Sequence, residues 1–291
     1  LSSISTGIRN TSFGYQTIKN NTTGGRNTSI GYQSLFSNVG GSFNTSIGDS
    51  SLFTNSSGSD NVAIGFTSLY SNTSGIYNVG LGRDTLFANT TGQYNVAIGY
   101  QALLSATTTS RNIAIGYQSL QSTTAQNNVG IGGESLGNNS SGTNNIAIGQ
   151  GAGKFIAGGS TANAITNFSI YIGNTTKALA NNQTNQIVIG YDETGLGSNT
   201  TIIGNSSTIT TALRGRLLLG TTTDSGLYQL DVNGTARVSG KLSITAGTTA
   251  ASQINLASST APTSPNNGDI WFDGTDLKMR IGGVTKTFTL V

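Results

Sequence analysis

The chain has 291 residues, of which only 9% are charged, whereas an ordinary soluble domain has about 25%. It has a formal net charge of +3, 41 Gly, 2 Pro, and neither Cys nor His. The missing Cys and His exclude a Ser-His-Asp triad, a cysteine nucleophile, a zinc finger and any disulfide.

We expect neither nucleic acid nor a membrane as a partner. The 14 basic residues form no cluster that would neutralise phosphates. No apolar run approaches the roughly 20 residues that a membrane-spanning helix needs. We also expect no cofactor. Because the chain begins at Leu1 instead of Met, we expect a processed chain or a fragment of a longer one.

A seventeen-residue repeat organises residues 1–150. It is marked by a glycine that follows an apolar residue, which we call the corner glycine. The corner glycines at the regular spacing are Gly14, Gly31, Gly48, Gly65, Gly82, Gly99 and Gly116, and Gly132 and Gly149 follow at spacings of sixteen and seventeen. A fixed period of this length is typical of solenoids.

Each position of the repeat has a physical role, shown here by one unit. In Val62-Ala63-Ile64, apolar residues flank a small one, and this alternation predicts a short β-strand before the corner glycine. Leu69, four residues after the glycine, is a second apolar anchor. Gly75, ten residues after it, lies in a turn where we expect glycine to supply a positive φ. Asn61 lies four residues before the corner glycine, and an asparagine occupies this position in every unit, so we expect a ladder of hydrogen-bonded amides.

One such unit cannot bury its apolar side chains alone, so we predict that the units stack as coils and bury them in continuous columns. Twelve coils at about 4.8 Å would give a rod of roughly 55–60 Å. Stacking also explains the scarcity of charge, because identical charges would repel at every step. The predicted fold class is all-β, a stacked parallel β-solenoid (β-roll or β-helix) of 17-residue coils with a small C-terminal antiparallel β-meander. The short period and the abundant Gly, Asn and Thr exclude a helical solenoid.

Residues 151–204 continue the solenoid less regularly, through Gly173, Gly190 and Gly204. The interval from Gly149 to Gly173 is longer than the regular one, so we expect residues 151–164 to form an insertion that is exposed as a loop. Its Gly-Ala-Gly-Lys start lacks the spacing and the following Ser or Thr of a phosphate-binding loop.

The last third of the chain has no 17-residue register. Residues 205–260 are predicted to be a β connector, with short strands within residues 217–220 and 228–234. Pro262 and Pro265 mark a boundary, after which residues 261–291 are predicted to form a three-stranded meander with turns at Asp273-Gly274 and Gly282-Gly283. About thirty residues are too few for an independent core, so we expect this meander to pack against copies from other chains.

Two families share features of the repeat. The Asn-Val-Ala-Ile-Gly core with a following Leu resembles the head repeats of trimeric autotransporter adhesins of the YadA type, which are left-handed parallel β-rolls. Units such as residues 27–38, and the later Leu-Asp-Val-Asn-Gly segment (230–234), look more like bacteriophage tail-fibre and related virion-fibre proteins. The resemblance covers residues 10–150 well and residues 167–204 loosely.

The resemblance implies a homotrimeric structural fibre of a virus particle, a bacteriophage tail or head fibre that reaches and attaches to the host cell surface. Its partners would be other virion proteins and a host receptor or glycan, and its location would be the virion. The alternative is a bacterial surface adhesin of the trimeric autotransporter type.

The candidate receptor contacts are aromatic. Tyr15, Tyr32, Tyr100 and Tyr117 each follow a corner glycine and precede a Gln, and Trp271 is the only tryptophan. Aromatic rings and amides suit sugars, whereas repetition at one register favours packing at a subunit interface or in the corner of the coil.

We assign no catalytic residue and expect no enzyme. An enzymatic tailspike would need paired carboxylates in a groove. The candidates are Asp231 and the pair Asp273 and Asp276, and turn chemistry explains the pair. An ice-binding solenoid is disfavoured, because the threonines lie mostly in turns instead of forming one file.

Overall fold

The computed structural model describes residues 6–208, 217–219, 230–232, 270–272, 277–281 and 283–288. The chain divides into two compact units, Leu1–Ala212 and Leu213–Val291. The described residues contain no helix that is long and apolar enough to cross a membrane.

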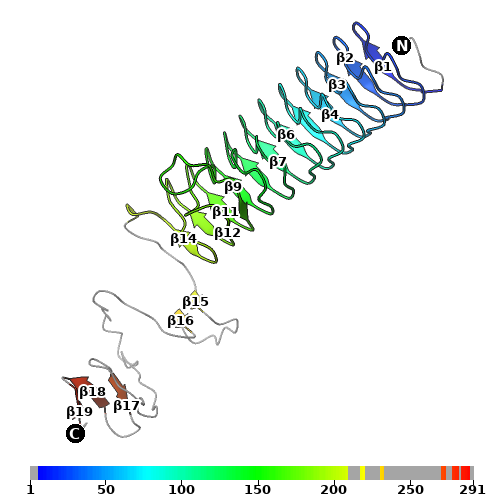
Figure 1. The fold of residues 1–291 in the computed structure, drawn as a ribbon. Coiled ribbons are helices and arrows are strands. Elements are labelled where there is room, and N and C mark those ends of the chain that lie inside the picture. Colours follow the sequence, from blue (N-terminus) through cyan, green and yellow to red (C-terminus); the bar gives the residue numbers. More distant parts are fainter. Residues whose placement is uncertain are drawn as a thin grey trace, which may run out of the picture. The chain divides into compact units, whose positions relative to one another are not determined.

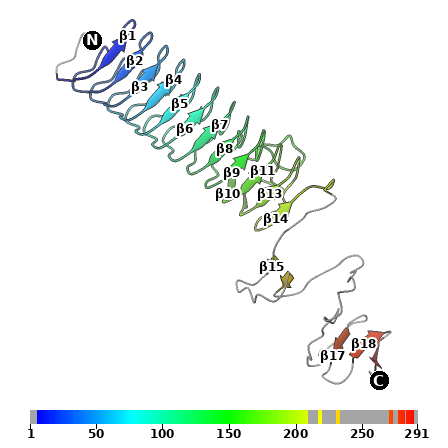
Figure 2. The ribbon, with the colours of Figure 1, turned by 180° about the vertical axis from the view of Figure 1, so that it is seen from behind.

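The first unit is the predicted solenoid of stacked coils (Figure 1), and its strands lie side by side along one face (Figure 2). Twelve short parallel strands form one sheet. They are β1 (Thr11–Phe13), β2 (Thr28–Ile30), β3 (Thr45–Ile47), β4 (Val62–Ile64), β5 (Val79–Leu81), β6 (Val96–Ile98), β7 (Ile113–Ile115), β8 (Val129–Ile131), β9 (Ile146–Ile148), β11 (Ile170–Ile172), β13 (Ile187–Ile189) and β14 (Thr201–Ile203). A second, two-stranded parallel sheet joins β10 (Thr166–Asn167) to β12 (Gln183–Thr184).

The pairing of the strands follows the repeat. Val62 lies opposite Val79, and Ile64 opposite Leu81, so equivalent residues stack on one another. The longer spacing after β9 does not interrupt the sheet, because β9 pairs directly with β11. The extra residues leave the coil as a loop closed by a bridge between Phe155 and Ala162. Residues 157–161 are exposed as predicted, but the prediction of exposure over residues 151–164 is wrong at its ends, because residues 151–153 and Asn163 are buried.

The interior of the coil is narrower than the sequence pattern suggests. Leu69 is fully buried, and so is Ala63 in the middle of its strand. The flanking Val62 is only half-buried and Ile64 is 38% exposed, because both point out of the coil. The prediction that stacking buries all apolar side chains is therefore right for the leucines and wrong for the paired strand residues. The interior of a regular coil holds one leucine and one small strand residue beside buried polar side chains such as Asn61 and Ser68.

The predicted positive φ of the turn glycines is also wrong. A positive φ occurs at the corner glycines, such as Gly65 (φ 135°), and at other residues in each coil, such as Leu69 (φ 53°). The turn position is glycine for a different reason, namely space. A Cβ on Gly41 would lie 2.2 Å from the carbonyl oxygen of Gly58 and 2.4 Å from Oδ1 of Asn38.

Buried amides fill much of the interior. The predicted asparagine ladder is present: Asn61 Nδ2 donates to Asn44 Oδ1 (3.1 Å) and to the Gly75 carbonyl (2.8 Å). A second ladder, which the sequence analysis did not identify, runs seven residues after the corner glycines. In it, Asn55 Nδ2 donates to Asn38 Oδ1 at 2.8 Å. These bonds hold adjacent coils together where an ordinary core would use apolar contacts.

The second unit contains two small sheets. β15 (Leu217–Leu219) and β16 (Leu230–Val232) form a parallel pair. β17 (Ile270–Phe272), β18 (Leu277–Ile281) and β19 (Val284–Phe288) form the predicted antiparallel meander. The proposed Asp273-Gly274 turn, Gly282, and the boundary at Pro262 and Pro265 lie outside the described residues.

Candidate binding surfaces

The broadest apolar surface of the solenoid is the outward side of its twelve-stranded sheet, which we call the outer face. It consists of the first and third residues of each strand, most of them Val or Ile. In β4, β8 and β9 the isoleucine at the third position is 37–40% exposed, although both neighbouring strands are in place. A single chain therefore leaves two parallel files of β-branched side chains in contact with water.

Two further columns of exposed side chains border this face. The leading column lies two residues before each strand and comprises Arg9, Arg26, Phe43, Asp60, Tyr77, Tyr94 and Arg111. The trailing column directly follows each corner glycine and comprises Tyr15, Tyr32, Asp49, Phe66, Arg83, Tyr100 and Tyr117. All leading residues have a φ of 57–62°, a left-handed conformation that repeats in each of these coils.

Four of the five candidate receptor contacts belong to the trailing column. Tyr15 and Tyr32 are stacked with ring centroids 5.3 Å apart, and Tyr100 and Tyr117 with centroids 5.7 Å apart. The rings are 39–61% exposed. Because stacking covers ring faces, these tyrosines offer mainly ring edges and hydroxyl groups to a partner, so a sugar could stack only at the ends of each pair.

The glutamines beside these tyrosines also pair along the axis. Gln33 Nε2 donates to Gln16 Oε1 at 2.9 Å, and Gln118 Nε2 donates to Gln101 Oε1 at 3.0 Å. The structure therefore supplies a packing role for this segment, while a receptor role stays a prediction. Trp271, the fifth candidate, is placed only by its backbone in β17, opposite Lys278 of β18, and its side chain lies outside the described part of the chain.

A third aromatic column lies elsewhere on the coil, directly after the buried leucines. Phe36, Phe53, Tyr70 and Phe87 form one continuous stack with centroids 5.1–5.3 Å apart. Lys19 lies over the ring of Phe36 at 5.3 Å and caps one end of the stack. The arrangement gives these side chains a packing role between adjacent coils.

The last coils of the solenoid carry a polar hollow that the sequence analysis missed. It has a volume of about 340 Å³ and is lined by Tyr191, Asp192, Glu193, Thr194 and residues 205–207. Tyr191 is 69% exposed and stacks on no other aromatic ring among the described residues. Asn205 Nδ2 donates to the Tyr191 carbonyl at 2.8 Å and ties the end of the solenoid to this turn.

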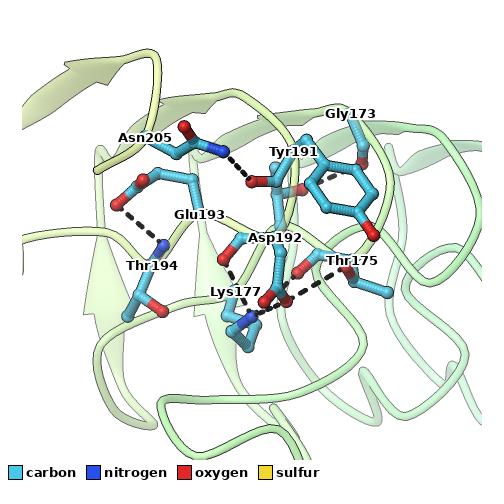
Figure 3. Close-up of polar contacts among 9 residues, drawn as sticks. Gly173, Thr175, Lys177, Tyr191, Asp192, Glu193, Thr194 and Asn205 are labelled. Carbon is cyan, nitrogen blue, oxygen red and sulfur yellow. Dashed lines mark hydrogen bonds and ion pairs between the residues drawn. The ribbon is translucent and has the colours of Figure 1, made fainter. Parts of the chain in front are cut away.

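The Asp192 carboxylate in this hollow is paired with a lysine (Figure 3). The Lys177 ammonium group donates to the Asp192 carboxylate, to the Asp192 carbonyl (3.1 Å) and to the Thr175 carbonyl (3.3 Å). The hydrogen bond from Lys177, and then its charge, lower the pKa of Asp192. Glu193 accepts a hydrogen bond from the Thr194 amide at 3.1 Å. Lys177 stands where other coils place the buried leucine, and that substitution is the signal that sequence reasoning could have used.

The side chains of the three carboxylates considered for catalysis all lie outside the described part of the structure, so their grouping stays a prediction. Asp231 lies in β16, where only its backbone is described, and Asp273 and Asp276 lie outside the described ranges. Lys154, from the segment compared with a phosphate loop, is paired with Glu134 at 2.7 Å. Across residues 6–208 and the described strands of the second unit, no cluster of three or more acidic side chains could hold a metal ion.

Comparison of the chain with models of protein families, with curated proteins and with solved structures yields no significant match. A functional assignment therefore depends on the residues and the geometry described above.

Proposed function

We propose that this protein is a structural fibre of a virus particle, a bacteriophage tail or head fibre, which assembles as a homotrimer and attaches the particle to the host cell surface. The observation that carries the proposal is the outer face: an elongated solenoid that keeps polar groups inside and two files of apolar side chains outside. Such a chain suits a rod made of several copies.

The size of this surface supports assembly. Twelve strands at about 4.8 Å, with leading and trailing residues six positions apart, span at most roughly 50 by 20 Å, or about 1,000 Å². A stable interface buries about 800 Å² on each partner. Three copies that turn their outer faces toward a common axis would remove this surface from water.

The work of such a fibre is reach and attachment. Stacked coils that are held by amide ladders and backbone hydrogen bonds form a stiff spacer, and the sides away from the outer face stay free for other virion proteins and for a host receptor or glycan. The unstacked ring of Tyr191, with amide and hydroxyl groups around it, is a place where a sugar could bind. The proposal assigns no catalytic activity.

Light scattering on the purified chain tests the assembly, since the monomer mass is 29.8 kDa. A mass of three chains supports the proposal, and a monomer at micromolar concentration refutes the trimer. Labelled protein should also bind host cells and compete with particle adsorption. Release of oligosaccharides from host polysaccharide would refute the absence of enzymatic activity.

The second candidate function is a bacterial surface adhesin of the trimeric autotransporter type. The Asn-Val-Ala-Ile-Gly units favour it, because the resemblance to adhesin head repeats is carried by those residues. The neighbourhood of the gene separates the two: capsid and tail genes support a virion fibre, and a full-length gene that ends in a membrane anchor supports an adhesin.

A further inference from the structure

The two columns that border the outer face are matched coil by coil. Every arginine in either column has a tyrosine at the other end of the same strand: Arg9 with Tyr15, Arg26 with Tyr32, Arg111 with Tyr117. The fourth arginine, Arg83, is matched in the opposite sense by Tyr77. Both aspartates, Asp49 and Asp60, have a phenylalanine at the other end.

Contact within one chain cannot explain this matching. The paired residues are six positions apart, on either side of a three-residue strand, and can be separated by up to about 20 Å. The two columns are also exposed, and no backbone or side-chain hydrogen bond among the described residues joins one to the other. Residues that are matched but cannot touch within a chain can meet between chains.

The contacts within each column leave suitable groups at its edge. Arg26 lies over the ring of Phe43 at 5.0 Å, and Arg83 lies between Phe66 (5.2 Å) and Tyr100 (5.9 Å). Both guanidinium groups thus lie against aromatic rings, and a guanidinium carries five N–H donors in its plane. The stacked tyrosines likewise keep their hydroxyl groups at the ring edge. One column thus offers N–H donors where the other offers hydroxyl acceptors.

We propose that the leading column of one chain lies against the trailing column of its neighbour at the same coil level, so that each arginine meets a tyrosine of the next chain. The inference rests on the proposed homo-oligomer. Cyclic symmetry about an axis parallel to the solenoid keeps equivalent coils at one height, and it brings the start of each strand near the end of the neighbour's strand. The matched pairs would then fix the axial register of the chains.

The alternative registers are shifted by one coil. In one of them, each leading residue lies opposite the trailing residue of the preceding coil. This register places Asp60 opposite the partner's Asp49, so that two like charges face each other. In the other, each leading residue lies opposite the trailing residue of the following coil. This register would form the ion pairs Arg26–Asp49 and Asp60–Arg83, but it needs an axial displacement of about 4.8 Å between chains. Cyclic symmetry supplies no such displacement when the strands run across the axis.

The absence of cysteine from the chain allows a direct test. Three double variants share Arg26→Cys and differ in the second cysteine: Tyr32→Cys at the same level, Asp49→Cys one coil above, and Tyr15→Cys one coil below. Each is treated with a short bismaleimide and separated on a denaturing gel. A link within one chain leaves its mass on the gel unchanged, so every covalent oligomer reports a contact between chains. Arg26→Cys alone is the control for background linking.

The same-level pair is expected to link into a three-chain product at least several-fold faster than either shifted pair. Faster linking of the Asp49→Cys or Tyr15→Cys variant, or equal linking of all three, overturns the register while the trimer still stands by light scattering. No linking of a protein that has the mass of three chains overturns it as well. A monomeric mass instead refutes the proposed function itself, so the two failures are distinguishable.

Discussion

Asn89 is the last member of the uninterrupted second amide ladder, and its buried Oδ1 has no hydrogen-bond partner among the described residues. Its Nδ2 donates to Asn72 Oδ1 at 2.8 Å, but the next position of the ladder is Ala106, which has no donor in its side chain. An unpaired buried acceptor costs about 1–3 kcal/mol. An asparagine placed at position 106 should donate to this acceptor and raise the free energy of unfolding by part of that cost.

The single change Ala106→Asn is not expected to succeed. Where a coil has asparagine in this ladder, the residue three positions later is glycine, and a Cβ on Gly92 would lie only 2.3 Å from Asn89 Oδ1. The coil of Ala106 has Thr109 at that place, and it is buried. The Thr109 side chain would therefore collide with a new amide at position 106.

The double variant Ala106→Asn/Thr109→Gly should remove this collision. We expect Thr109→Gly alone to lower the free energy of unfolding by about 1 kcal/mol, because glycine is entropically unfavourable. It also loses the hydrogen bond between Asn112 Nδ2 and Thr109 Oγ1 (3.3 Å). The double variant should be more stable than the sum of the two single effects by about 1–3 kcal/mol.

Urea unfolding followed by circular dichroism measures this coupling, provided that the slope m is the same in all variants. The matched control is Ala106→Asn combined with Thr108→Gly, since Thr108 is exposed and adjacent to the buried threonine. Additivity within about 0.5 kcal/mol for both pairs would refute the explanation that asparagine and glycine are matched by space.

Gly41→Ala should lower the free energy of unfolding by about 1–3 kcal/mol, because its Cβ would lie 2.2 Å from a carbonyl of the next coil, whereas Gly40→Ala should change it by less than about 1 kcal/mol. Thermal melts of the two variants compare them, and equal effects would contradict the packing argument. Leu69→Ala should lower the free energy of unfolding by about 3–5 kcal/mol, and Ile64→Ala should lower it much less in a dissociated chain. Assembly should bring the two losses closer together, and urea titrations at two protein concentrations would detect this change. Burial raises the pKa of the Tyr171 hydroxyl above the ordinary value of 10.0. The contribution of the neutral phenol to stability is therefore complete below pH 10.0, where the unfolded chain keeps the same proton, and it is lost as the pH rises through the folded pKa. Absorbance titration should show one late phenolate that is absent in Tyr171→Phe, and an unchanged titration would contradict it.

The repeat period predicted the position of the strands well. Residues 62–64, 79–81 and 96–98 are strands where alternation before a corner glycine predicts them, and the parallel stacking follows from the period. The prediction succeeded because a solenoid has only nearest-neighbour contacts, so a local unit repeated at a constant spacing determines the architecture.

The side of the strand that faces inward could not be read from the same pattern. Alternation shows that Val62 and Ile64 share a face, but not which face is inside. The usual rule places apolar residues in the core, and it fails here because Asn61, Leu69 and a small strand residue already fill a narrow coil. The positive φ of Leu69 was equally inaccessible, since propensity rules place that conformation at glycine.

The polar hollow at the end of the solenoid was missed because it appears where the register is weakest. Lys177 occupies the position of the buried leucine, and the Asp192 carboxylate of the next coil accepts a hydrogen bond from it. The two residues are fifteen positions apart in the sequence, not the seventeen of the repeat. Periodicity averages out such exceptions, whereas comparing each coil with the consensus, position by position, would have found the ion pair.

The apolar side chains of each regular coil are divided between the core of the chain and its outer face. Each regular coil buries one leucine, worth about 1.5–3 kcal/mol, and leaves two strand side chains roughly one-third exposed. Covering those two would add about 1–2 kcal/mol per coil. Over twelve strands, assembly would thus contribute apolar stabilisation comparable with that of the core of the chain. Under the proposed assembly, the stability of the chain would depend on its concentration, and dissociation and unfolding should be closely coupled.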